Sequence, residues 1–150
     1  MKAQVRAWNG LRVLLLALAL IAPLTPVWAS DDADVPDGDI PQSVDEATTI
    51  DAAAAYALWQ KGVAFVDVRK DARWATGHIP NATHLYLDKG FSAESLAQVA
   101  QPDQEVVIYC DRGVLSSVAV ETAVFWDYAK LYYFRNGMHA WSAAGYPVEK

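Results

Sequence analysis

The stretch VVIYCDRGVLSS, residues 106–117, decides the fold class and holds Cys110, the only cysteine in the chain. Its first four residues are apolar and largely β-branched, so that "EVVIYC" (105–110) is typical of a strand buried in a parallel sheet. Over residues 116–129 apolar side chains recur at helical spacing, and a serine is available as the N-cap. The sequence therefore predicts a core strand, a short loop that begins with the cysteine, and a helix.

The same alternation continues on both sides of this unit. Strands are predicted over 63–68, 84–87 and 130–134, helices over 51–62, 92–100 and 137–145, and a short helical turn within 70–82. A chain that alternates in this way forms an α/β domain, with a parallel sheet covered by helices on both faces. Ligands of such sheets bind at the carboxyl ends of the strands, which is where Cys110 and residues 67–69 fall.

Residues 1–29 have the layout of a secretory signal peptide. Three basic residues accompany an apolar run at 13–22, and Val27 and Ala29 supply the small side chains that signal peptidase accepts. We therefore expect cleavage near Ala29 and export, most simply to the periplasm, with no membrane attachment afterwards. The alternative is an uncleaved N-terminal membrane anchor, although ten apolar residues are short for a membrane span.

Residues 30–43 are acidic, and we interpret them as a flexible leader in front of a domain at 44–150. Eight Asp or Glu and no Lys or Arg occur in residues 31–51, whereas residues 52–150 carry ten acidic and nine basic side chains. The domain is thus nearly neutral and offers no basic face to nucleic acid. A single cysteine permits no disulfide within the chain, and we expect a monomer.

The position of Cys110 suggests a reactive thiol. Backbone N–H groups of the loop and the positive end of the following helix would favour its thiolate. Gly113 would let the backbone curl close to the sulfur. The residues therefore indicate a nucleophilic cysteine in an anion-stabilising loop, one that can also hold a persulfide. The alternative is an inert buried thiol that packs like a small apolar side chain.

Three motifs together resemble the rhodanese-like sulfurtransferase family, in its single-domain, thiosulfate sulfurtransferase form. They are FVDVRKDARWATGHIPNA (65–82), YCDRGVLSS (109–117) and RNGMHAWSAAGYPV (135–148), and they span about residues 44–149. The resemblance implies a parallel sheet of about five strands. It also implies transfer of sulfane sulfur from thiosulfate or mercaptopyruvate to cyanide, a thiol or an acceptor protein. Cys110 would carry that sulfur as a persulfide, without a metal or a separate cofactor.

The resemblance also assigns roles to residues around Cys110. Asp67 and Arg69 match an Asp-x-Arg pair that braces the active site. The loop amides would hold the persulfide, and this loop consists of Asp111, Arg112, Gly113, Val114, Leu115 and Ser116.

The loop departs from the common pattern Cys-Arg-x-Gly-x-Arg-Ser, because Asp111 and Leu115 replace both arginines. Arg112 is then the candidate for steering an anionic donor, or else a solvated surface side chain. An acid next to the nucleophile would disfavour the thiolate. We hypothesise that Arg73, where relatives commonly carry Glu, pairs with Asp111 and holds its carboxylate away from Cys110. Leu115 makes the loop less positive, which predicts weak activity with thiosulfate.

Other functions fit the sequence less well. A phosphatase of the Cys-x5-Arg type would need arginine at Ser116, and a thiol oxidoreductase would need a second cysteine. A catalytically weak or silent rhodanese-like module, used for binding or for carrying sulfur, remains the main alternative. His78, His84 and His139 have no metal-ligand spacing, so structural roles and no metal site are expected.

Overall fold

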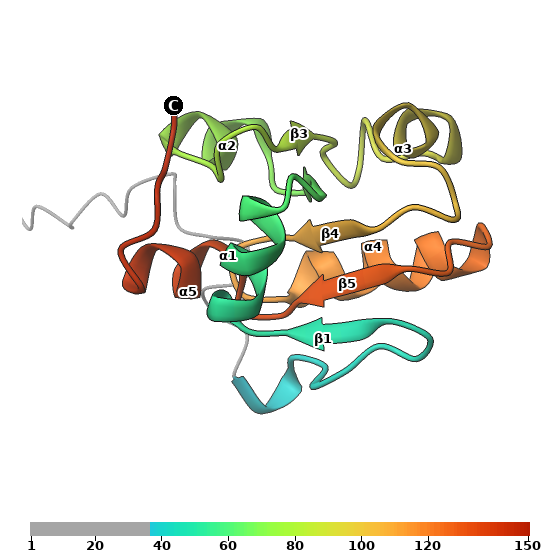
Figure 1. Cartoon of the computed structure of the whole chain (residues 1–150), viewed down its shortest axis with the longest axis horizontal. Helices are drawn as coiled ribbons and strands as arrows, with labels where there is room; N and C mark the ends of the chain where they lie inside the picture. The colour runs from blue at the N-terminus through green and yellow to red at the C-terminus, as the bar shows by residue number, and fades with distance from the viewer. Residues whose placement is uncertain (1–36) are drawn as a thin grey trace, which may run out of the picture.

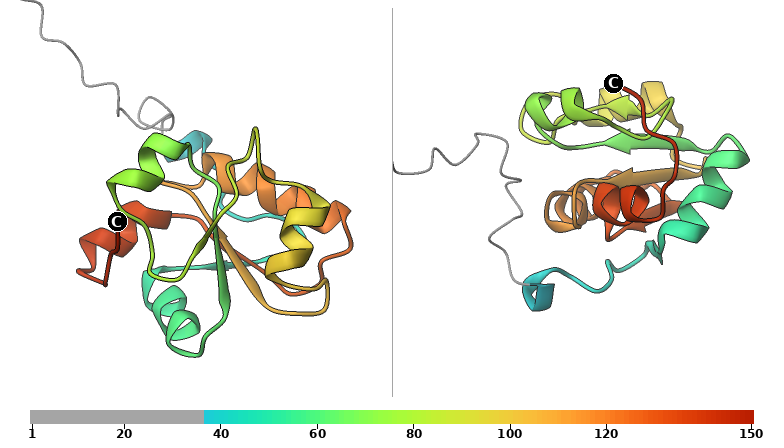
Figure 2. Two further views of the ribbon diagram at one scale, coloured as in Figure 1. Left: turned by 90° about the horizontal axis from the view of Figure 1, so that it is seen from above. Right: turned by 90° about the vertical axis from the view of Figure 1, so that its left-hand side faces the viewer.

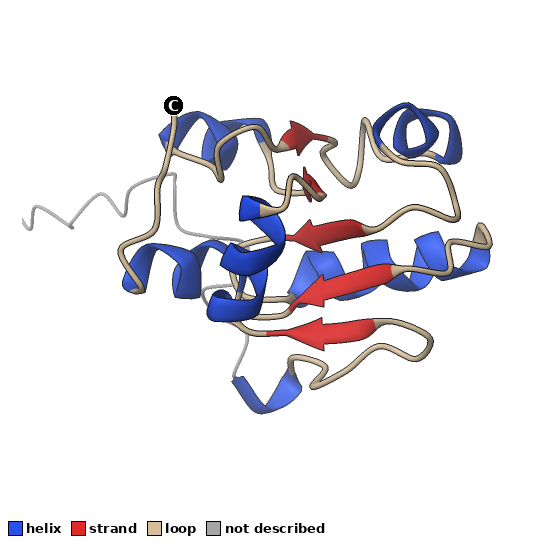
Figure 3. Ribbon diagram, in the orientation of Figure 1, coloured by secondary structure: helices blue, strands red, loops and turns tan. Residues whose placement is uncertain are grey.

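A computed structural model describes residues 37–150, and the predicted signal peptide lies outside them. Within these residues five strands form one parallel sheet in the order β1-β5-β4-β2-β3. The helices alternate with the strands along the chain (Figure 1, Figure 3). The strands are β1 Thr48–Ile50, β2 Ala64–Asp67, β3 Thr83–His84, β4 Val106–Tyr109 and β5 Leu131–Phe134. The helices are η1 Asp37–Asp39, α1 Ala52–Gln60, α2 Asp71–Thr76, α3 Ala93–Val99, α4 Val114–Phe125 and α5 Gly137–Ala143. The predicted α/β class is confirmed.

Helices cover both faces of the sheet, and β4 at its centre shows how the sequence divides between them. Val106, Ile108 and Cys110 point into a core cluster that includes residues of α3 and α4. Val107 and Tyr109 point into the opposite cluster, which includes residues of α1 and α5. Successive side chains of a strand face opposite sides, so a fully apolar strand must be covered twice. In Figure 1, α1 accordingly lies in front of the strands and α4 behind them, and Figure 2 gives two further views of these layers.

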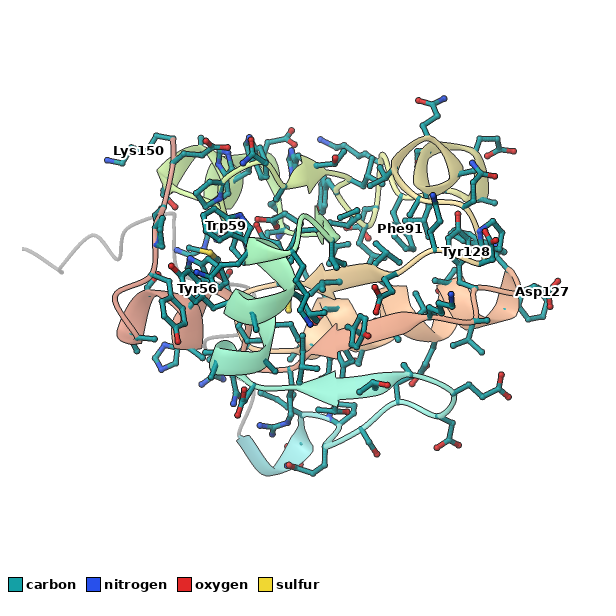
Figure 4. All side chains as sticks on the ribbon, viewed as in Figure 1. Tyr56, Trp59, Phe91, Asp127, Tyr128 and Lys150 are labelled. Carbon is teal, nitrogen blue, oxygen red and sulfur yellow. The ribbon has the colours of Figure 1, made fainter. Side chains whose placement is uncertain are left out.

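Aromatic rings fill much of the cluster under α1 and α5. Trp141 is fully buried and meets Phe65 and Phe134 edge-on. Tyr56 and Trp59 of α1, labelled in Figure 4, stack with ring centroids 5.6 Å apart. The Trp59 indole N–H donates to the carbonyl of Pro80, so its polar end is satisfied. These contacts fix α1 and α5 against one face of the sheet.

Two strands differ from the sequence-based expectation. β1 was not predicted from the pattern, because its three residues include only one buried side chain, Ile50. It becomes a strand by pairing with β5 at the edge of the sheet. β3 has two residues instead of the expected 84–87. The chain still follows β2 there, since the amides of Leu85 and Leu87 donate to carbonyls at the end of that strand.

Helix α4 begins and ends earlier than the predicted range 116–129. It starts at Val114, directly after Gly113, and no side chain caps its N-terminus. The predicted serine cap is therefore wrong, because Ser116 and Ser117 lie inside the first turns. At the other end the chain turns away after Phe125, and the amide of Tyr128 donates to the carbonyl of Ala123.

The folded unit extends further toward the N-terminus than the predicted boundary at residue 44. Ile40 is only 2% exposed. The carbonyl of Pro41 accepts hydrogen bonds from the Tyr133 hydroxyl and from Nε of Arg135, each at 3.1 Å. One apolar side chain within an acidic stretch thus anchors the end of the leader to the domain. Across the described residues, no helix has the length and apolar character needed to cross a membrane.

Candidate active site

Cys110 follows the last residue of β4, and its side chain is fully buried. The backbone N–H of Gly113 donates to its Sγ at 3.0 Å. The hydroxyl Oγ of Ser116 lies 3.4 Å from the same sulfur. A sulfur that accepts from an oriented N–H group is stabilised when it carries negative charge. The loop therefore curls around the sulfur as expected, with Val114 and Leu115 opening α4 behind it.

Gly113 has a backbone conformation that glycine favours, with φ at 113°. A Cβ at this position would lie 2.5 Å from the Arg135 carbonyl oxygen, 2.6 Å from the Tyr133 hydroxyl and 2.9 Å from Cγ2 of Ile40. We expect a glycine here so that the backbone can curl close to the sulfur, and the Gly113 nitrogen does lie 3.0 Å from Sγ. The structure adds a second reason, because the loop packs closely against the end of β5 and against the N-terminal segment.

A second glycine, Gly137, closes the loop from the other side. Its φ is 39°, and a Cβ there would overlap the carbonyl of Cys110. The close approach lets the start of α5 bind the loop: the amide of Met138 donates to the Cys110 carbonyl at 2.9 Å, and that of His139 to the Asp111 carbonyl at 3.1 Å. The sequence pattern assigns no role to Gly137, although Gly137 lies within the third motif, residues 135–148.

Asp67 and Arg69 form a buried ion pair at the end of β2. Nε of Arg69 donates to Oδ1 of Asp67 at 3.0 Å, and Nη2 to Oδ2 at 2.6 Å. Arg69 also donates to the carbonyl of Gly77 and, at 3.2 Å, to Oδ1 of Asp111. Burial by itself would lower the pKa of Arg69. The hydrogen bond and charge of Asp67, together with the charge of Asp111, outweigh burial and raise the pKa above its ordinary value, so the guanidinium stays charged.

Arg73 and Asp111 form the pair that the sequence led us to hypothesise. Nε of Arg73, on α2, donates to Oδ2 of Asp111 at 3.0 Å, and its Nη2 donates to Oδ1 at 2.9 Å. This is the bidentate arrangement in which guanidinium and carboxylate bind most strongly. With Arg69 on Oδ1 as well, the Asp111 carboxylate is held by two arginines, whose positive charges balance that of the acid next to Cys110.

Two pockets open beside the loop, of about 540 Å³ and about 560 Å³. Both are lined by Arg112, His139 and Ala143, and the first is also lined by Arg69, Arg73 and Asp111. Cys110 is not among the lining residues of either. Leu115 is partly buried and packs against the core cluster that contains Cys110. The pockets thus adjoin the loop, but the buried sulfur does not line either of them.

The three histidines fall into two groups. His78 and His84 stack on the ring of Trp74, with centroids 3.4 Å and 4.7 Å away, which agrees with structural roles. His139 is exposed and lines both pockets, so its imidazole does not have the structural role expected of it. Between residues 37 and 150, no three His, Cys, Asp or Glu side chains are grouped as a metal site.

Comparison with known proteins places these features in a family. The family model of the rhodanese-like domain matches residues 51–144. A protein named thiosulfate sulfurtransferase GlpE, from Vibrio cholerae, is 31% identical over 107 residues, which cover 71% of this chain and 98% of the relative.

Solved structures share the fold at lower identity. A thiosulfate sulfurtransferase from Pseudomonas aeruginosa superimposes with a TM-score of 0.61 at 20% identity, over 69% of this chain and 20% of that one. A polysulfide-sulfur transferase homodimer from Wolinella succinogenes gives a TM-score of 0.58 at 23% identity, over 69% of this chain and 79% of that one. The family model covers the Cys110 loop, the Vibrio relative is matched over almost its whole length, and the chain therefore belongs to the rhodanese-like family.

Proposed function

We propose that this protein is a sulfurtransferase that carries sulfane sulfur as a persulfide on Cys110. The observation that carries the proposal is the Gly113 N–H on Sγ at 3.0 Å, in a loop that Gly113 and Gly137 fix from two sides. The hydrogen-bond donors of such a loop already point at the sulfur before it becomes charged, so the loop need not reorganise. This preorganisation is usually the largest electrostatic contribution to catalysis.

The reaction takes place in two displacements. The Cys110 thiolate attacks the outer sulfur of a donor such as thiosulfate, the donor's S–S bond breaks, and sulfite leaves with the electron pair. Cys110 then carries a terminal sulfur with a negative charge. Cyanide or a thiolate attacks that terminal sulfur and leaves as thiocyanate or as a persulfide, and the Cys110 thiolate is restored. No metal or separate cofactor takes part in either step.

The ion-pair network positions the loop and does not react. Arg69 joins the end of β2 to Asp111, and Arg73 joins α2 to the same carboxylate. Since Asp111 follows Cys110 directly, these bonds set the direction in which the loop leaves β4. They also remove the charge that would otherwise oppose the thiolate.

The names of the relatives support a sulfur donor but leave its identity open. The Vibrio relative is named for thiosulfate, and the Wolinella structure for polysulfide. Here Leu115 replaces an arginine, and we therefore propose thiosulfate as a weak donor and a less charged sulfur compound as the better one. A thiol, free or on an acceptor protein, is the proposed acceptor.

A second candidate is a weak or silent rhodanese-like module that binds or carries sulfur without turnover. The complete burial of Cys110 favours it, because a donor reaches the sulfur only after neighbouring side chains have moved. The release of thiocyanate from thiosulfate and cyanide distinguishes the two. Multiple turnovers that Cys110→Ala abolishes support the enzyme, and at most one equivalent of cyanolysable sulfur per chain supports the carrier.

We also propose that the protein acts in the periplasm after cleavage near Ala29. The support is the layout of residues 1–29, which lie outside the described structure. Cell fractionation and the N-terminal sequence of the secreted protein test this. A mature N-terminus at Ser30 in the periplasmic fraction is the expected result, and a full-length protein in the membrane fraction would contradict it.

A further inference from the structure

The segment that precedes β1 packs directly on the Cys110 loop at Gly113. A Cβ added to Gly113 would lie 2.6 Å from the Tyr133 hydroxyl and 2.9 Å from Cγ2 of Ile40. Both of these side chains are buried. Neither they nor Pro41 line the two pockets beside the loop. The segment therefore contacts the loop at a place that a molecule in either pocket does not touch.

The Tyr133 hydroxyl joins this segment to the loop. It lies 3.1 Å from the carbonyl oxygen of Gly113 and 3.1 Å from that of Pro41. A hydroxyl has one proton to donate, so the two carbonyls share it in a three-centre hydrogen bond. The Pro41 carbonyl also accepts from Nε of Arg135 at 3.1 Å, and the carbonyl of Ile40 accepts from Nη2 at 3.4 Å. Side chains from β5 and from the residue after it thus hold the segment against Gly113.

Gly113 is also a residue that donates to the reactive sulfur. Its N–H donates to Sγ of Cys110 at 3.0 Å, while its carbonyl accepts from the Ser117 amide at 2.9 Å. The hydrogen bonds to the carbonyl and the contacts around Cα together fix the direction of the N–H. A donor that is already in place stabilises a charged sulfur better than one that has to move into place.

Part of this support lies outside the residues that the family model matches. That match covers residues 51–144, so it includes Tyr133 and Arg135 but neither Ile40 nor Pro41. The last residues of the acidic leader thus form part of the structure around the sulfur, in addition to linking the domain to what precedes it.

We propose that Tyr133 and Ile40 are positioning residues for the reaction of Cys110, because they hold the Gly113 N–H on its sulfur. The proposal rests on the proposed function, in which a Cys110 thiolate starts the first displacement and is restored by the second. Since neither residue lines the pockets, loss of either should lower kcat and leave KM for the sulfur donor unchanged.

The first test follows the Gly113 amide in the full chain by ¹H–¹⁵N NMR, well below the unfolding temperature. Tyr133→Phe keeps the ring in the core, and the carbonyls of Gly113 and Pro41 keep their bonds from Ser117 and Arg135, so the variant should fold. We expect the Gly113 amide proton to move upfield and its shift to depend more strongly on temperature, because its bond to the sulfur loosens. With polysulfide as the donor, kcat should fall about fivefold, as expected for the loss of about one hydrogen bond.

Tyr132→Phe is the matched control for the hydroxyl. Tyr132 is the neighbouring residue of β5, its side chain points to the opposite face of the sheet, and its hydroxyl donates to Glu105. This variant should leave the Gly113 amide and kcat as they are in the parent. An equal effect in Tyr132→Phe would overturn the proposal.

Two variants of Ile40 test the packing contact. Ile40→Ala removes the Cγ2 methyl next to Gly113 and should change the Gly113 amide and kcat in the same direction as Tyr133→Phe. Ile40→Val keeps a methyl group at that place and should behave like the parent. A Gly113 amide that is unchanged in Tyr133→Phe or in Ile40→Ala, or a loosened amide with unchanged kcat, would overturn the proposal. If the amide loosens as expected but Cys110 of the parent never takes up sulfur, the proposed function fails and the positioning of Gly113 stands.

Discussion

Arg73 and Asp111 are 38 residues apart in the chain and form a bidentate ion pair beside the only cysteine. The pair joins α2 to the loop that follows β4. Its side chains are 26% and 10% exposed, so it is sheltered from solvent but not fully buried. The charge of the acid next to Cys110 is thus balanced by an arginine from another element.

Charge reversal tests this pair. Arg73→Glu should place two carboxylates together and lower the free energy of unfolding by about 2 kcal/mol, less than for a fully buried pair because Arg73 is partly exposed. Adding Asp111→Arg should recover part of the loss. Full recovery is not expected, since Arg69 also binds Asp111 and would then face an arginine. Urea denaturation of the two single variants and the double variant measures the coupling, and strictly additive effects would contradict the pairing.

The sequence was informative where local pattern and charge decide the structure. The apolar strand before Cys110 and the helical spacing after it predicted β4 and α4. The unusual acid at Asp111 and the unusual base at Arg73 together predicted an ion pair between segments distant in the chain. Each of these predictions rests on residue types that few other structures would suit, since an apolar strand has to be buried and an acid beside Cys110 needs a positively charged partner.

Other features depend on contacts that a sequence pattern does not contain. β1 has two exposed residues out of three and becomes a strand only by pairing with β5. Ile40 lies in an acidic stretch, yet it is buried beside Gly113. The role of Gly137 follows from how closely α5 approaches the Cys110 carbonyl, which only the folded chain reveals.

Gly137→Ala should disable the loop. The new Cβ would overlap the Cys110 carbonyl, so the start of α5 must move away. We expect the free energy of unfolding to fall by more than about 3 kcal/mol or, if the variant still folds, persulfide formation to be lost. Gly145→Ala is the matched control, because Gly145 also has a positive φ, 73°, but nothing lies within 4 Å of its Cβ position. That variant should lose only about 1 kcal/mol from backbone strain. Equal losses in thermal or urea unfolding would argue against the close contact.

Access to Cys110 should depend on Leu115. The sulfur is fully buried in a cluster against which Leu115 packs, so alkylation by iodoacetamide should be slow and should accelerate in Leu115→Ala. Leu115→Arg should in addition raise kcat/KM for thiosulfate, by about tenfold, because a positive charge at the loop attracts the anionic donor. Steady-state kinetics in which the parent already prefers thiosulfate to uncharged sulfur donors would contradict this reasoning.

Stability should decline at alkaline pH through Tyr109. Burial raises the pKa of its hydroxyl well above the usual value, and the negative charge of Asp67 adds to the effect. Below about pH 10 the hydroxyl keeps its proton in both the folded and the unfolded chain, and its contribution is constant. Above that pH the unfolded chain releases the proton while the folded chain retains it. The free energy of unfolding then falls, by up to about 1.4 kcal/mol per pH unit.

Urea denaturation between pH 8 and pH 11 measures this slope. Tyr109→Phe should flatten it, at the cost of the hydrogen bond that the Ile79 amide donates to the hydroxyl. Tyr128 and Tyr132 also have raised pKa values, the first from burial and the second chiefly from its hydrogen bond to Glu105, so some slope should remain. An unchanged slope in Tyr109→Phe would show that this residue is not its source.

The proposal that Cys110 carries sulfur as a persulfide can be tested with a mass spectrum of the intact protein. After treatment with a sulfane sulfur donor, we expect one added sulfur atom, located on the peptide that contains Cys110, removed by cyanide and absent from Cys110→Ser. A protein whose mass does not change with thiosulfate, with polysulfide or with an organic persulfide would contradict the claim.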